Sequence, residues 1–139
     1  MDTYSRHLVF HGAVVLLVGL LCGVPYGLAV NRKAPEHIVH SWRVAHASIP
    51  LGAALMFGVA AVLSHLGASA LLKWAVALFL IVSSYAFCFS LPLAAVVGHR
   101  GLSARGPISA KLVYAGNLVG AVSSLLAAAA LIYAAYVSL

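Results

Sequence analysis

The stretch Trp74–Val97, WAVALFLIVSSYAFCFSLPLAAVV, decides the fold, because none of its 24 residues is charged. About 20 apolar residues span the hydrocarbon core of a bilayer as a helix. Three more charge-free runs of similar length are Leu8–Val30, Val44–Leu63 and Leu112–Leu139. None of the four alternates polar and apolar residues as barrel strands do. The sequence therefore predicts an all-α membrane protein, a four transmembrane helix bundle that forms one domain over residues 1–139.

Charge is too scarce for a soluble domain. Of the 139 residues, 64% are apolar and 7% are charged, whereas soluble domains have about 25% charged residues. Asp2 and Glu36 are the only carboxylates, which excludes carboxylate-pair glycosidases and intramembrane Ser-His-Asp triads. The net charge of +6 does not indicate nucleic-acid binding, because no basic cluster is interleaved with aromatics. The expected surroundings are a lipid bilayer.

The distribution of basic residues predicts the topology. The loops 31–43 and 98–111 have three Lys/Arg each, whereas the N-terminal segment and the middle loop have one each. The positive-inside rule then puts both richer loops in the cytoplasm. The first apolar run is longer than the core of a signal peptide and lacks a clear cleavage site, so it is expected to remain as a helix.

Small residues predict how the helices pack. Gly19, Gly23 and Gly27 form a small-xxx-small ridge in the first run, and Gly116 and Gly120 form another in the last. Such ridges let helix backbones approach closely in a membrane. The alternative is that they clear space for a flat ligand. Because a bundle this small has little interior, we expect a complete pocket to need a second subunit.

His46 is the sharpest candidate for a functional side chain, because it lies inside the second run among small residues. Pro50, four residues later, cannot donate to the His46 carbonyl. Such a His can hold a haem iron through Nε2, or it can be a hydrogen-bonded structural residue. For His11, in the first run, we expect a hydrogen bond to a neighbouring helix.

Other haem and metal layouts fit less well. The third and fourth runs contain no His, which disfavours two bis-His haems. No CxxCH motif indicates covalent haem attachment. Cys22 and Cys88 each lie within an apolar run and are expected to be small buried hydrophobes without a disulfide. Among the remaining polar residues, Tyr85 and Asn117 are candidates for a pocket, and the serines are expected to be structural residues that bond back to their own helix.

The chain resembles the styrene oxide isomerases, small bacterial four-span membrane proteins. Ala34-Pro35-Glu36 followed by Trp42-Arg43-Val44-Ala45-His46 is similar to that family's Pro-Glu…Trp-x-x-Ala-His motif. Arg6-His7 to His11-Gly12 is similar to the start of its first helix, and Arg100-Gly101-Leu102 with Gly106-Pro107 to the segment before its last. The resemblance covers nearly the whole chain and implies a place in the bacterial inner membrane.

The resemblance also implies a cofactor and a reaction. The family binds haem b between subunits of a homotrimer with the motif His as axial ligand, which is His46 here. Trp42 and Pro50, one helical turn on either side, are then expected to border the haem. The family converts small apolar aryl epoxides to aldehydes, with ferric haem as the Lewis acid. Tyr85 and Asn117 are the side chains expected to hold the substrate.

Three positions depart from the family pattern. Gly52 stands where the family has an Asn six residues after the axial His, and Ser83 and Phe87 stand where it has an Asn and a Tyr four apart. A changed substrate is therefore one open alternative. A second is a non-catalytic haem b protein for electron transfer or gas sensing. A third is a structural membrane subunit without a cofactor.

Overall fold

The computed structural model describes all of residues 1–139, as five helices without a strand. The helices are α1 (Thr3–Leu21), α2 (Gly23–Asn31), α3 (Glu36–Leu63), α4 (Ala70–Val97) and α5 (Ile108–Tyr136). Since α2 continues α1, the chain has four segments of 28 or 29 residues that are long and apolar enough to cross a membrane. The prediction of an all-α, four-span protein is confirmed.

The helices extend beyond the charge-free runs. α3 begins at Glu36, so His37 and His40, which the sequence placed in a loop, lie in its first turns. A helix of this length measures about 42 Å at 1.5 Å per residue, which matches a bilayer with its headgroup regions. The runs without charge mark only the hydrocarbon core, because a helix can continue with charged side chains among the headgroups. The connections therefore shorten to residues 32–35, 64–69 and 98–107.

The first span is interrupted at Cys22, between α1 and α2. Pro25 explains the break, because it has no N–H to donate to the carbonyl of Leu21 four residues earlier. Pro50 and Pro92 lie inside α3 and α4, and neither divides its helix into two.

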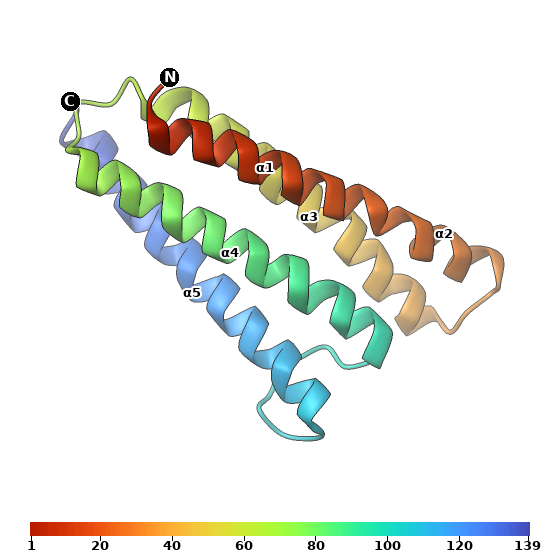
Figure 1. Cartoon of the computed structure of the whole chain (residues 1–139). Helices are drawn as coiled ribbons and strands as arrows, with labels where there is room; N and C mark the ends of the chain where they lie inside the picture. Colours follow the sequence, from red (N-terminus) through yellow and green to blue (C-terminus); the bar gives the residue numbers. More distant parts are fainter.

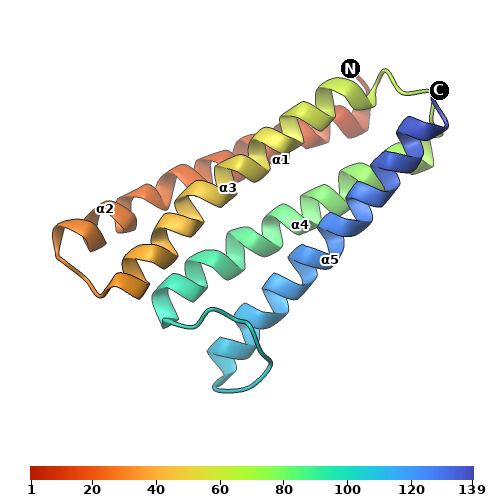
Figure 2. The ribbon, with the colours of Figure 1, turned by 180° about the vertical axis from the view of Figure 1, so that it is seen from behind.

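The helices form two pairs, α1 with α3 and α4 with α5 (Figure 1). α4 also contacts α1 and α3, whereas α5 packs directly against no helix other than α4. Both chain termini lie at one end of the molecule, opposite the loops 32–35 and 98–107 (Figure 2). Helices α3 and α5 therefore do not contact each other, and the side of the bundle between them is open, with α4 at its base.

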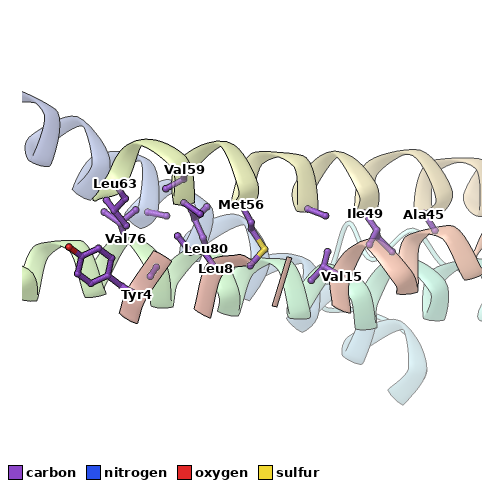
Figure 3. Close-up of a cluster of buried hydrophobic side chains, with 14 of the residues drawn as sticks. Tyr4, Leu8, Val15, Ala45, Ile49, Met56, Val59, Leu63, Val76 and Leu80 are labelled. Atoms are coloured by element: carbon purple, nitrogen blue, oxygen red, sulfur yellow. The ribbon is translucent and has the colours of Figure 1, made fainter. Parts of the chain in front are cut away.

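The buried core lies where α1, α3 and α4 meet (Figure 3). Leu8 and Val15 of α1 are fully buried there, together with Met56 and Leu63 of α3 and Val76 of α4. Many other large apolar side chains are exposed, among them Leu71, Leu125 and Ile132. In a membrane these side chains face lipid, which is as apolar as they are.

The glycine ridges are packing surfaces, as predicted. A Cβ at Gly19 would overlap the ring of Pro50, and one at Gly116 would lie 2.8 Å from Cβ of Ser90. Gly27 differs, because a Cβ there would meet nothing within 4 Å.

Candidate functional site

The His46 side chain lies between α3 and the first span, where its orientation is fixed by one hydrogen bond. Its Nδ1 lies 3.0 Å from the carbonyl oxygen of Gly19. A carbonyl can only accept, so Nδ1 has the proton and donates it. In the neutral ring Nε2 then has the lone pair, which is the atom with which an imidazole ligates a metal. The interpretation of His46 as a hydrogen-bonded residue is confirmed, and its role as a ligand stays a prediction.

Two residues of α2 shape the space around the His46 ring. A Cβ at Gly23 would lie 2.9 Å from Cε1 of His46 and 3.1 Å from Nδ1, so only glycine admits the ring in this position. Tyr26 stacks on the ring with centroids 6.1 Å apart and planes 27° apart. No sequence pattern connects Tyr26 with His46, because the contact joins two helices whose register the sequence does not define.

Trp42 and Pro50 flank His46 at intervals of four residues and so share a face of α3 with it. Trp42 is partly buried against the hydrophobic core. The ring of Pro50 lies against Gly19. Both therefore border the neighbourhood of His46, and their contact with a cofactor stays a prediction.

A second feature is an apolar cleft of about 680 Å³ on the open side of the bundle. Its lining residues come from all three other spans as well as α3 and are Val15, Ser48, Ile49, Leu51, Gly52, Leu55, Leu80, Ser83, Ser84, Phe87, Leu91 and Ser124. Gly52, Ser83 and Phe87 are the three positions at which the chain departs from the family pattern. Helices α3 and α4 bring all three together in this cleft.

The cleft has hydroxyl groups and no titratable side chain. The Ser124 hydroxyl donates to the Ala121 carbonyl of its own helix at 2.8 Å, as expected. The Ser83 hydroxyl instead donates across to the Gly120 carbonyl of α5 at 2.8 Å. The Ser84 hydroxyl faces the sulfur of Met56 at 3.2 Å. A thioether is a weak acceptor, so Ser84 can offer its hydroxyl proton to a ligand more readily than Ser83 or Ser124.

Tyr85 and Asn117 lie outside this cleft. The Tyr85 hydroxyl is 2.9 Å from Nδ1 of His11 on α1, which confirms the expected interhelical bond of His11. Asn117 donates its side-chain N–H to the carbonyl of Arg100 at 3.2 Å. Neither residue lines the cleft or is hydrogen-bonded to His46 in the single chain, and their catalytic role stays a prediction.

A polar cluster at the terminal end of the molecule is satisfied internally. Lys73, which is only 8% exposed, places Nζ 5.6 Å from the centre of the Tyr4 ring. The Tyr4 hydroxyl donates to the carboxylate of Asp2. This arrangement explains how a buried lysine is tolerated at the start of α4.

No three His, Cys, Asp or Glu side chains lie close enough together to hold a metal ion. Cys22 and Cys88 are free thiols, as predicted. A haem needs only one axial His from the protein, so His46 remains the ligand that the sequence and the geometry both favour.

The fold and the site define a small four-span membrane protein with a metal-competent His on one face of α3 and an apolar cleft on another. The family model described as styrene oxide isomerase matches residues 4–136. The chain therefore belongs to the styrene oxide isomerase family, and the resemblance found in the sequence is confirmed. No curated protein is a significant match. Family membership points to an isomerase that acts on epoxides within the membrane.

Proposed function

We propose that the protein is a haem b-dependent isomerase that converts apolar epoxides, of the aryl class, to aldehydes. Family membership supports the reaction class. The observation that supports the cofactor is the hydrogen bond from His46 Nδ1 to the Gly19 carbonyl, because it leaves Nε2 free to ligate iron. When bound, ferric haem supplies a Lewis-acidic iron for the epoxide oxygen.

The residues around His46 fit a flat cofactor. Trp42 and Pro50 lie one turn on either side on the same face of α3. Nothing lies within 4 Å of a Cβ built at Gly27, so α2 leaves open space one turn beyond Gly23. We propose that His46 is the axial ligand and that Trp42 and Pro50 contact the porphyrin.

We propose a homotrimer with haem at its subunit interfaces, which the positions of His46 and the cleft support. Leu55 lines the cleft and is nine residues from His46, which places it about 180° away around α3. One chain therefore directs His46 and the cleft to opposite sides. In an oligomer, His46 of one subunit can face the cleft of the next, so that each site combines two chains.

The cleft accounts for the product. Isomerisation breaks one C–O bond of the epoxide and moves a hydride to the adjacent carbon, so no atom is added or lost. Water that captured the intermediate cation would give a diol instead. The cleft walls are mainly apolar and include no acid or base that could activate water, and we therefore expect aldehyde as the main product.

We propose that the end of the molecule formed by loops 32–35 and 98–107 is cytoplasmic in a bacterial inner membrane. Six Lys/Arg lie at this end, whereas Arg6 and Lys73 lie at the opposite end. The asymmetry supports this orientation under the positive-inside rule.

The alternative is a haem protein without turnover, for electron transfer or gas sensing. It is favoured by Gly52, Ser83 and Phe87, which remove three polar side chains of the family pattern from the cleft. A measurement of epoxide turnover by the haem-loaded protein distinguishes the isomerase from the non-catalytic haem protein.

The test uses detergent-purified wild-type protein and the His46→Ala and His11→Ala variants. We expect a Soret band that sharpens on reduction in the wild type, its loss in His46→Ala, and its retention in His11→Ala. Native mass spectrometry should give haem-loaded trimers. A panel of aryl and alkyl epoxides is then offered to the oxidised protein. Absence of turnover from the haem-loaded protein would reject the isomerase and leave the non-catalytic function; a full Soret band in His46→Ala would reject the ligand.

A further inference from the structure

A second hollow continues the cleft toward the basic end of the molecule. It measures about 260 Å³ and lies between α3, α4 and the loop 98–107. Leu91 lines both this hollow and the cleft. The two therefore adjoin at Leu91, and we call the pair together the α3–α4 groove.

The register of α3 supports a continuous groove. Ser41 and Val44 line the hollow, and Ser48, Gly52 and Leu55 line the cleft. These residues recur at intervals of three or four and so lie along one face of the helix. From Ser41 to Leu55 the groove rises about 21 Å at 1.5 Å per residue. This is much longer than a single aryl epoxide.

The mouth of the groove is cationic. Arg100 and His40 line it, and Arg43 donates to Nδ1 of His40 at 2.9 Å. His40 therefore keeps its other ring nitrogen as a donor. Glu36 is the only carboxylate at this end, and it borders the shallow hollow next to the mouth together with Arg100. Six basic residues against one acid make this end complementary to an anion.

The backbone at Arg100 is held in place by α5. Asn117 donates to the Arg100 carbonyl at 3.2 Å. Gly101, with a φ of 63°, lies so close that a Cβ there would come within 2.9 Å of the Asn117 side-chain nitrogen. The mouth is thus a defined structure rather than a free loop, and Asn117 is a positioning residue for it.

We propose that the α3–α4 groove binds a single-chain amphipathic carboxylic acid. Its carboxylate lies between Arg100 and His40, and its apolar chain passes Leu91 to reach Gly52 and Ser84. This deepens the proposed function and rests on it: if the protein is an isomerase of aryl epoxides, its substrate is an acid whose apolar chain ends in an aryl epoxide at the depth of Ser84. The replacement of the family's polar residues by Gly52 and Ser83 suits such a substrate, because the carboxylate orients it instead.

The first experiment measures binding and does not depend on haem. Radiolabelled dodecanoate is bound to the full-length protein in nanodiscs of zwitterionic lipid, with unlabelled dodecanoate or methyl dodecanoate as competitor. We expect the acid to compete at least about tenfold better than the ester, which corresponds to one charge-assisted hydrogen bond. Arg100→Gln should remove this difference. Arg105→Gln is the matched control, since Arg105 is in the same loop and lines neither hollow.

One further variant tests the cleft end of the groove. Gly52→Leu should fill the cleft and weaken the binding of both acid and ester, because Gly52 lines it. Equal competition by acid and ester, or undiminished binding to Arg100→Gln, would overturn the proposal. A copurifying phospholipid that dodecanoate does not displace would also overturn it and make the groove a lipid site.

The second experiment measures turnover. We expect a long-chain acid that ends in an aryl epoxide to have a KM at least about tenfold below that of its methyl ester. Arg100→Gln should raise the KM of the acid with little change in kcat. Equal KM values for acid and ester would reject the proposed substrate class. Failure of both epoxides to react, with dodecanoate still bound, would reject the proposed isomerase and leave the acid-binding groove in place.

Discussion

Replacing Gly23 by alanine tests whether the position of the His46 ring matters for haem. The new Cβ would lie 2.9 Å from Cε1 of His46, about 0.5–1 Å closer than carbon atoms prefer. Because the methyl group is fixed to the backbone of α2, the ring must move. A shift of that size carries Nδ1 from 3.0 Å to beyond hydrogen-bonding distance of the Gly19 carbonyl.

The loss can be expressed as haem affinity. The bond itself is worth about 1 kcal/mol, and removal of a group that orients a metal ligand typically costs about 10- to 100-fold in affinity. We expect Gly23→Ala to bind haem at least about tenfold more weakly than the wild type. The assay is titration of the apoprotein with haemin, followed at the Soret band.

Gly27→Ala is the matched control. It lies one turn further along the same ridge, and its Cβ would meet nothing within 4 Å. Both substitutions raise helix propensity, so neither should lower the thermal midpoint through the backbone. Equal haem affinity of the two variants, at unchanged helical content, would refute the assignment of His46 as a ligand oriented by Gly23.

Three further predictions concern other contacts. Tyr85→Phe should lower the unfolding free energy by about 1 kcal/mol in a detergent denaturation assay, because His11 loses its hydrogen-bond partner. If the cleft holds the substrate, kcat should change less than about twofold in the same variant. Gly52→Asn should raise kcat/KM for styrene oxide by about tenfold, which corresponds to one good hydrogen bond, because the added side chain enters the cleft without a clash. If a kinetic assay shows no gain, the cleft is not the substrate site. Gly101→Ala should destabilise the loop by at least about 1 kcal/mol, because its φ of 63° and its contact with Asn117 exclude a Cβ, and faster proteolysis of the loop would measure it.

The sequence was sufficient to predict the spans because the charge pattern reflects the bilayer directly. It was less successful at their ends. His37 and His40 are polar and near charges, so they resemble loop residues, yet they continue α3 into the headgroup region. Neither composition nor the lengths of the apolar runs distinguishes a helix from a loop at that depth.

The candidate site was predictable only in part. His46 could be recognised from its own helix, through its small neighbours and the motif around it. The cleft depends on the register between α3 and α4, which brings Gly52, Ser83 and Phe87 together and which no local pattern defines. Tyr85 illustrates the difference: two residues along a helix from Ser83, it points to another side and meets His11 instead.

The single neighbour of α5 has a consequence for biosynthesis. Membrane helices are made and inserted in chain order, N-terminal segments first. The core formed by α1, α3 and α4 contains most of the buried side chains and can assemble while α5 is still inside the ribosome. α5 then packs against α4, the one helix that it contacts and with which it forms a helical hairpin. Ser124 and the Asn117 contact to Arg100 arrive with it, so the nascent chain completes the wall of the cleft and fixes the loop 98–107 only at the last step of its synthesis.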